Sequence, residues 1–158
     1  MSGTSADRGA RYGTVKDWMT HRPETVPVDY PIHAALGRMR DFEIRHLLVV
    51  DGDRLVGIVS SRDVRRLLTG ETPARLSEPV SRIMTEDPVT AAPETPVTDA
   101  ARLLLDRRIG GLPVREGDDI IGVFTTSDAL EALLSVVERP GALPHRRSRR
   151  SSIRGASL

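Results

Sequence analysis

Two seven-residue motifs carry the residue types best suited to hold an anionic ligand. They occupy residues 57–63 and 122–128, and they read Gly-Ile-Val-Ser-Ser-Arg-Asp and Gly-Val-Phe-Thr-Thr-Ser-Asp. A hydroxyl group together with backbone N–H groups at the start of a helix forms a natural phosphate site. The same spacing fits a capping box, in which a hydroxyl residue and an acidic residue three positions later bond the first turn of a helix. The spacing by itself leaves ligand binding and helix capping both open.

The two motifs belong to an internal repeat that spans most of the 158-residue chain. A shift of 65 residues aligns 15–68 with 80–133 without a gap, and 16 of the 54 aligned positions are identical. Composition alone would give roughly a third as many identities. The predicted organisation is a flexible N-terminal lead (1–14), a first repeat (15–68), a linker (69–79), a second repeat (80–137) and a basic tail with the composition of a disordered segment (138–158).

Each repeat has the same predicted order of elements. A leading segment that ends in Met-Thr (15–20 and 80–85) precedes an extended piece (24–28 and 88–92). Pro31 and Pro96 suit the first turn of a helix, and Thr95 suits the N-cap of the second such helix. An acidic-Gly-Asp turn between apolar runs then predicts a β-hairpin, with strands at 47–50 and 55–60 and again at 112–115 and 120–125. A final helix is predicted at 61–68 and 126–137.

A single β-α-β-β-α unit of this length is too small to bury a full core alone. Two copies that pack sheet against sheet would remove that deficit. The sequence therefore predicts an α+β fold, an α/β sandwich-like arrangement of two pseudo-symmetric repeats packed through their sheets.

The pattern resembles a tandem CBS (cystathionine-β-synthase-type) domain pair, also called a Bateman module. The resemblance covers residues 15–137, and it rests on the Met-Thr-x-x-Pro segments at Met19 and Met84, the strands at 45–51 and 110–114, and the two motifs above. It implies that two chains associate through their helices into a disc-like homodimer. The apolar faces of the helices predicted at 31–42 and 96–107 are the candidate surfaces.

The resemblance also implies a ligand site in the cleft between the repeats. In the family, the aspartate accepts hydrogen bonds from the ribose of an adenosine-type ligand, the hydroxyl side holds phosphate, and the glycine lets backbone approach the ligand. The adenine is expected between the extended piece and the hairpin. The implied ligand-binding residues are Thr25, Val26, Pro27, Arg45, His46, Ser60, Ser61, Arg62 and Asp63 in the first repeat, and Thr90, Ala91, Ala92, Thr125, Thr126 and Asp128 in the second. The implied ligands are AMP, ADP, ATP or another adenosyl compound such as S-adenosylmethionine or NAD, with no cofactor required.

The repeats differ where the family often places a basic residue aimed at phosphate. The first repeat offers Arg45 and His46, with Arg62 nearby, whereas the second has Gly110 and Gly111. We therefore expect unequal sites, with more phosphates favoured beside Asp63. A solvated surface is the alternative interpretation of the arginines, because 22 of the 23 basic residues are arginine.

Composition excludes several kinds of chemistry. The chain has no cysteine, which excludes disulfides, thiol catalysis and cysteine zinc sites. The four histidines show no metal-ligand spacing, and no P-loop, nucleophile elbow or acid–base pair is present. We therefore predict no enzyme activity, no catalytic residue and no metal site.

Charge and hydropathy bound the partners. No apolar run approaches a membrane span and the first residues lack a secretory pattern, so we predict a cytoplasmic protein with no membrane partner. The net charge is +1, but residues 140–158 hold five arginines and no acid, which leaves 18 basic and 22 acidic residues elsewhere. An acidic body is a poor general nucleic-acid binder.

Three functions remain open at this point. The first is a stand-alone regulatory sensor that binds an adenosine nucleotide and signals to a separate, unidentified protein. The second is a ligand-free dimeric interaction scaffold, in which the hydroxyl and aspartate residues are only caps. The third is nucleic-acid contact through the Arg-rich tail, the least favoured of the three.

Overall fold

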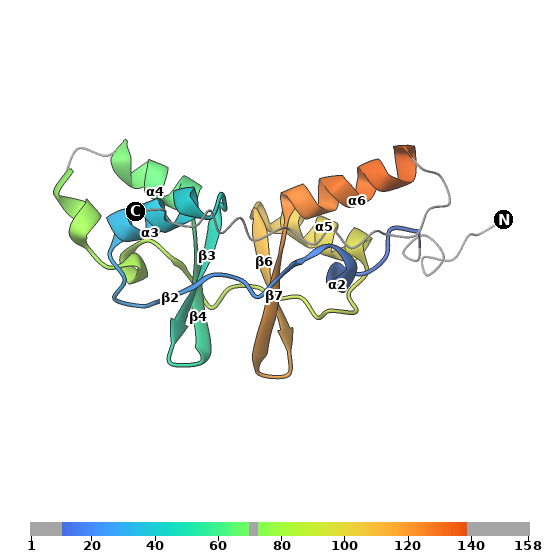
Figure 1. Cartoon of the computed structure of the whole chain (residues 1–158), viewed down its shortest axis with the longest axis horizontal. Coiled ribbons are helices and arrows are strands. Elements are labelled where there is room, and N and C mark those ends of the chain that lie inside the picture. The colour runs from blue at the N-terminus through green and yellow to red at the C-terminus, as the bar shows by residue number, and fades with distance from the viewer. Residues whose placement is uncertain (1–10, 70–72, 139–158) are drawn as a thin grey trace, which may run out of the picture.

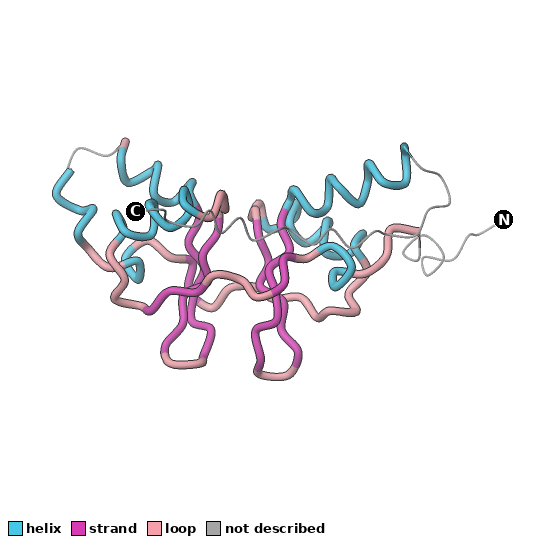
Figure 2. Tube along the Cα trace, viewed as in Figure 1, coloured by secondary structure: helices cyan, strands magenta, loops and turns pink. Residues whose placement is uncertain are grey.

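The computed structural model describes residues 11–69 and 73–138, in which the repeats form two similar halves with the hairpins side by side at the centre (Figures 1 and 2). The first repeat contains α2 (Val15–Trp18), β1 (Thr20–His21), β2 (Thr25–Pro27), α3 (Ile32–Asp41), β3 (His46–Asp51), β4 (Arg54–Ser60) and α4 (Ser61–Leu68). After the short 3-10 helix η1 (Pro73–Ser77), the second contains η2 (Val80–Arg82), β5 (Thr85–Glu86), α5 (Val97–Arg107), β6 (Gly111–Glu116), β7 (Asp119–Thr125) and α6 (Thr126–Glu138). The predicted α+β class is confirmed, and the predicted hairpins and helices agree with these bounds to within one residue.

The starts of α3 and α5 differ from the predictions. Pro31 and Pro96 are the N-cap residues of α3 and α5 and not their first helical residues. The hydroxyl of Thr95 accepts a hydrogen bond from the backbone N–H of Ala92 at 3.1 Å, so it organises the preceding turn and caps no helix. Residues 88–92 form no continuous strand, but Ala91 makes a parallel bridge to Val114 of the hairpin, in agreement with the predicted extended piece.

The leading segment of each repeat pairs with the hairpin of the other repeat. Strand β1 is antiparallel to β7, with Thr20 opposite Val123, and β5 is antiparallel to β4, with Thr85 opposite Ile58. The two sheets therefore have the strand orders β2-β3-β4-β5 and β1-β7-β6. Each leading segment completes the sheet of the repeat to which it does not belong in sequence.

The glycine that opens each motif makes room for this exchange. A Cβ atom on Gly57 would collide with the sulfur of Met84, and one on Gly122 would lie 2.5 Å from the sulfur of Met19. The backbone carbonyl oxygen of the residue after each methionine would also lie within 3.1 Å of these Cβ positions. The resemblance implied that these glycines admit a ligand, but the structure shows them packed against the exchanged segment. A Cβ would displace protein at both positions.

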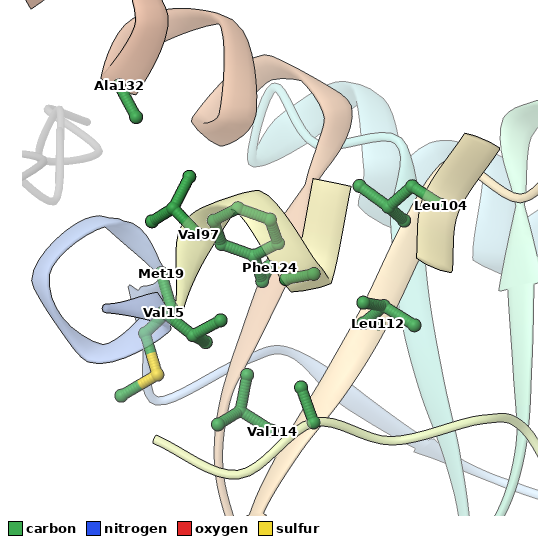
Figure 3. Close-up of a cluster of buried hydrophobic side chains, with 10 residues drawn as sticks. Val15, Met19, Val97, Leu104, Leu112, Val114, Phe124 and Ala132 are labelled. Carbon is green, nitrogen blue, oxygen red and sulfur yellow. The ribbon is translucent and has the colours of Figure 1, made fainter. Parts of the chain in front are cut away.

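The exchange also builds the hydrophobic cores. The core of the first repeat takes Val80 from the second leading segment, and the core of the second repeat takes Val15 and Met19 from the first (Figure 3). A smaller cluster joins the two hairpins through Leu48, Ile58 and Val123. At about 1.5–3 kcal/mol for each large apolar side chain buried, the exchanged residues stabilise the pair substantially. The predicted packing of the repeats through their sheets is confirmed.

The backbone repeats its special conformations at the same offset of 65 residues. Positive φ angles occur in three matched pairs: Arg22 (52°) with Asp87 (46°), Glu43 (54°) with Arg108 (53°), and Gly52 (61°) with Gly117 (61°). The glycine pair lies in the hairpin turns, where the left-handed conformation is required and glycine adopts it without steric cost. The two repeats therefore share backbone geometry even where their side chains differ.

The apolar faces predicted for a dimer point inward. Residues such as Ile32 and Met39 on α3, and Val97 and Leu104 on α5, are buried in the cores. These faces are therefore wrong as candidate dimer surfaces, because the chain's own sheets cover them. The exposed large apolar side chains gather mainly on α6 instead, at Leu130, Leu133, Leu134 and Val137. No helix within 11–69 or 73–138 has the length and apolar character to cross a membrane.

Segments outside the predicted repeats also take part in the fold. The backbone N–H of Val97 donates to the carbonyl of Gly13 at 3.1 Å, so the end of the predicted lead packs on the second repeat. In the predicted linker, the carbonyl of Glu78 accepts a hydrogen bond from the N–H of Ile32 at 2.9 Å. Of the predicted tail (138–158), residues 139–158 lie outside the described residues, as do residues 1–10 of the predicted lead.

Candidate ligand-binding site

The first motif forms a capping box where β4 meets α4. Atom Oδ2 of Asp63 accepts hydrogen bonds from the backbone N–H of Ser60 at 2.8 Å and from its hydroxyl at 2.7 Å. The hydroxyl oxygen in turn accepts the N–H of Asp63 at 3.3 Å. Both bonds to the carboxylate end at Oδ2, so Oδ1 is left as the acceptor for a further donor.

The second motif forms the same arrangement where β7 meets α6. Atom Oδ2 of Asp128 accepts hydrogen bonds from the backbone N–H of Thr125 at 2.7 Å and from its hydroxyl at 3.0 Å. Asp128 is only 2% exposed and is the one buried charged residue in the described part of the chain. A buried carboxylate requires such partners, because it has lost its hydration. The second cap is therefore less open to solvent than the half-buried Asp63.

A third capping box lies outside both motifs. Asp17 accepts hydrogen bonds from the backbone N–H of Thr14 at 2.8 Å and from its hydroxyl at 3.2 Å, at the start of the four-residue helix α2. The same hydrogen-bond pattern therefore occurs where the family places no ligand. Capping geometry alone is therefore not evidence of binding, and the other two caps differ from this one in where they lie.

Both motif caps lie beside the junction between the repeats. Ser60 is opposite His46 on the neighbouring strand, and Thr125 is opposite Gly111, so each pair shares a face of its sheet. The imidazole of His46 crosses the junction. A Cβ atom placed on Gly111 would lie 3.0 Å from ring atom Cδ2. The two caps are thus brought to one region, with the ring of His46 between their strands.

Two basic side chains, Arg45 and Arg62, act on His46 beside the first cap. Burial lowers the pKa of His46 below its ordinary value of 6.5; the carboxylate of Asp63 opposes this shift, and the positive charges of Arg45 and Arg62 add to it. The imidazole is therefore neutral at pH 7. Both arginines are exposed to solvent. They supply positive charge next to the start of α4, whose backbone N–H groups also favour an anion.

The extended piece of the first repeat is already hydrogen-bonded to its hairpin. Strand β2 is parallel to β3, with Val26 opposite Val49. The side chain of Val26 is buried, whereas those of Thr25 and Pro27 are exposed. A base therefore has no room between these two backbones, although the exposed side chains remain open to contact.

The second extended piece is joined to its hairpin in a similar way. The N–H of Ala91 donates to the carbonyl of Pro113 at 2.9 Å, and the N–H of Arg115 donates to the carbonyl of Ala91 at 2.9 Å. Ala91 is buried, Thr90 is half-buried and Ala92 is exposed. Backbone hydrogen bonds therefore join both extended pieces to their hairpins, and the expected place of adenine beside these pieces stays a prediction.

Gly110 and Gly111 have a packing role that their sequence did not predict. They were expected only to lack a phosphate contact, but a Cβ atom on either residue would lie 3.0–3.3 Å from ring atoms of His46. The absence of side chains here therefore lets the ring of the first repeat lie against the second. The signal was present in the repeat alignment, which sets His46 against Gly111.

The assembled groups suit binding better than bond-breaking chemistry. Two helix N-termini, two hydroxyls, two carboxylates, one imidazole and two exposed guanidinium groups can recognise an anion and a diol. Among residues 11–69 and 73–138, no group of three or more His, Cys, Asp or Glu side chains gathers as a metal site.

Comparison with known proteins agrees with this geometry. The sequence profile of the CBS domain matches residues 15–70 and 80–135, so the chain belongs to the CBS domain family. A CBS domain-containing protein of Dictyostelium discoideum is 36% identical over 135 residues, which are 78% of this chain and 93% of that protein. An inosine-5'-monophosphate dehydrogenase of Nitrosopumilus maritimus is 37% identical, but the matched region covers 70% of this chain and only 22% of the enzyme.

Solved structures of CBS pairs have the same fold and include ligand complexes. CBSX2 in complex with AMP has a TM-score of 0.70 and is 28% identical, with 78% of this chain and 98% of that chain covered. A CBS domain pair in complex with 5'-methylthioadenosine and S-adenosyl-L-methionine has a TM-score of 0.68 and is 29% identical, with 77% and 95% covered. The CBS-pair family is regulatory and not catalytic by itself, and enzymes carry such pairs as a separate part.

Proposed function

We propose that this chain is a stand-alone regulatory module that binds an adenosine-type nucleotide between its repeats and signals to a separate partner protein in the cytoplasm. The observation that carries the proposal is the convergence of two capping boxes, each at the N-terminus of a helix of eight or more residues, on one junction. The adenosyl ligands bound by similar CBS pairs support the same ligand class.

The residues take the following roles in this proposal. Asp63 keeps its cap through Oδ2 and accepts a ribose hydroxyl at Oδ1. Ser61 and Arg62, in the first turn of α4, bind phosphate through backbone N–H and guanidinium groups. Thr126 and Asp128 form the corresponding, less exposed site at α6. The exposed side chains of Thr25, Pro27 and Ala92 and the half-buried Thr90 flank the base, whereas the buried Val26 and Ala91 contribute only to the cores.

Thermal unfolding against a ligand panel tests the proposal. The panel contains AMP, ADP, ATP, NAD and S-adenosylmethionine, with GMP as the control for the base. A ligand at a hundred times its dissociation constant adds about 2.7 kcal/mol to the free energy of unfolding. For a chain of this size we expect the midpoint to rise by several degrees. Asp63→Ala should remove the part of this rise that comes from ligand bound at the first site. Asp128→Ala should remove the part that comes from the second site.

The third capping box supplies a matched control. Asp17→Ala removes the same pair of hydrogen bonds at α2 and lowers stability as a lost cap does, by about 0.5–2 kcal/mol. It should leave the ligand-dependent rise in midpoint intact. Equal loss of that rise in all three variants, or no rise with any adenosyl ligand, would contradict the proposal. The ligand-free scaffold would then be the better reading.

We also propose that the chain forms a homodimer, with the exposed apolar side chains of α6 at the contacting surface. Leu130, Leu133, Leu134 and Val137 are 46–67% exposed on one helix, and exposed apolar patches often mark surfaces that bind another protein. Light scattering at micromolar concentration should give twice the monomer mass. Leu134→Lys should restore the monomer, and a strictly monomeric wild type would contradict the proposal.

A further inference from the structure

Helices α4 and α6 occupy matching places in the two repeats but carry opposite charge. Each follows the second hairpin strand of its repeat, and both lie on the side of the molecule opposite to the hairpin turns (Figure 1). Helix α4 contains three arginines and one aspartate, a net charge of +2. Helix α6 contains one aspartate, two glutamates and no basic residue, a net charge of −3. The two helices are therefore electrostatically complementary.

Side chains on the surface of the two helices carry most of this charge. Arg65 and Arg66 on α4 are exposed, Glu138 on α6 is exposed, and Glu131 on α6 is half-buried. Among the ion pairs formed within residues 11–69 and 73–138, none involves any of these four side chains. Each of the four can therefore pair with a charge on a second molecule.

The exposed surface of α6 is apolar where that of α4 is cationic or polar. At the repeat offset of 65, Leu130 stands where α4 has Arg65, and Leu134 stands where the chain has Thr69. An arginine side chain can lay its methylene groups along an apolar surface while its guanidinium group stays at the polar edge. A contact between α4 and α6 would therefore cover leucines with arginine methylenes and let the guanidinium groups reach the glutamates.

A contact between two copies of the same helix lacks this complementarity. Two α4 helices would bring a charge of +2 against a charge of +2, and two α6 helices would bring −3 against −3. Like charges that face each other across an interface are destabilising, and they suppress the arrangement that creates them. The charge pattern therefore disfavours an interface in which each helix meets its own copy.

We propose that a second copy of this chain covers both helices, in a head-to-tail dimer in which α4 of each chain contacts α6 of the other. This inference rests on the homodimer proposed above and adds to it the orientation of the two chains. Arg65 and Arg66 pair with the glutamates of the partner's α6, and the leucines of that helix lie under the arginine methylenes. Because each chain offers both helices, a two-fold axis generates two identical contacts and the assembly closes at two chains.

Charge reversal on α6 distinguishes the two orientations. Glu131→Arg combined with Glu138→Arg replaces two negative charges by two positive ones, which changes the net charge of α6 from −3 to +1. In the head-to-tail dimer this helix faces α4, so the dissociation constant of the dimer should rise about tenfold or more. Sedimentation equilibrium over a concentration series measures it. In a dimer of like helices the same change removes repulsion between two α6 helices, so a fall in the dissociation constant would overturn the inference.

A second reversal should rescue the dimer. Adding Arg65→Glu and Arg66→Glu to the α6 variant changes the net charge of α4 from +2 to −2, which restores opposite charges across the contact. The dissociation constant should then return toward that of wild type, and a failure of this rescue would count against the contact. The matched control reverses two exposed acids near the hairpin turns, Asp53→Arg and Asp119→Arg, and should leave the dissociation constant unchanged.

Cross-linking reports the orientation directly, because the chain has no cysteine of its own. Thr69→Cys marks the end of α4, and Leu133→Cys marks the exposed surface of α6. With a flexible bismaleimide, the variant that carries both cysteines should give cross-linked dimers, whereas neither single variant should.

The outcomes separate this inference from the homodimer on which it rests. Cross-linked dimers in either single variant, or none in the double variant, would overturn the head-to-tail orientation while a dimeric mass leaves the homodimer standing. A strictly monomeric wild type would overturn both proposals.

Discussion

The two repeats stabilise the same contact with opposite chemistry. In the first, Arg38 on α3 donates from Nε and Nη2 to one carboxylate oxygen of Glu24, at 3.0 and 2.8 Å. Sixty-five residues later the matching positions are Val89 and Leu103, and both pack against the core of the second repeat. The backbone geometry therefore does not depend on the ion pair. At the same spacing in the second repeat, two apolar side chains pack against the core instead.

The surfaces of the two final helices differ even more. Arg62, Arg65 and Arg66 are exposed on α4, whereas the matching positions on α6 are Ser127, Leu130 and Glu131. The caps at the start of both helices remain the same. The comparison shows that the duplication kept what positions the helices and changed what they present to other molecules.

The largest predicted effect tests how much the packing of each leading segment on the other repeat contributes to stability. Gly122→Ala should lower the free energy of unfolding by about 1–3 kcal/mol, because the new methyl group meets Met19 and the backbone oxygen of Thr20 at 2.9 Å. Gly57→Ala should cost less, because the matching oxygen is 3.1 Å away. Urea denaturation measures both changes.

Gly37 provides the control for that experiment. It lies in the middle of α3, and nothing lies within 4 Å of a Cβ atom placed on it. Gly37→Ala should raise stability by up to about 1 kcal/mol, the difference in helix propensity. A Gly122→Ala variant as stable as Gly37→Ala would argue against the exchanged packing.

A smaller effect is the pH dependence of stability that His46 causes. The second repeat has no counterpart of this group, because Gly111 stands at the matching position. The folded state holds the pKa of His46 below its unfolded value of about 6.5. The unfolded chain therefore takes up the proton first, and stability should fall as the pH falls below about 6.5 toward the folded value. His46→Gln should flatten this part of the curve of stability against pH, and His21→Gln should not. The same slope in wild type and His46→Gln would show that other groups cause the loss.

The smallest effect tests whether the apolar residues of the second repeat can replace the ion pair of the first. Glu24→Val combined with Arg38→Leu copies the second repeat into the first, and its stability should stay within about 0.5 kcal/mol of wild type, since the ion pair is partly exposed. Either single change should lower the free energy of unfolding by up to about 1 kcal/mol. A double-mutant cycle then gives the coupling energy between Glu24 and Arg38. A coupling that is unchanged in 1 M salt would contradict an electrostatic origin.

Local patterns predicted the elements well because the information was local. Acidic-Gly-Asp turns between apolar runs fixed both hairpins, and the hydroxyl-x-x-Asp spacing fixed the starts of α4 and α6. The same hydrogen bonds left the ligand question open, as the box at Thr14 and Asp17 shows. The candidate residues were therefore identified, while their roles were not.

The sequence pattern could not predict which hairpin each leading segment pairs with. Because the repeats are alike, Thr20 fits β4 and β7 equally well by residue type, and the choice depends on chain geometry and core packing. The position of His46 depends on that choice too, since the ring needs the second repeat beside it. The error over the apolar faces of α3 and α5 has a related cause, because periodicity shows that a face is apolar but not what covers it.

The exchanged leading segments also set an order for folding during synthesis. The first repeat is complete in sequence once Leu68 has been made, yet its core still lacks Val80 and its sheet still lacks β5. It must wait for the start of its neighbour before it can close. The second repeat, by contrast, finds Val15, Met19 and β1 already present when its hairpin is made. The half translated last therefore has all its parts as soon as α6 leaves the ribosome.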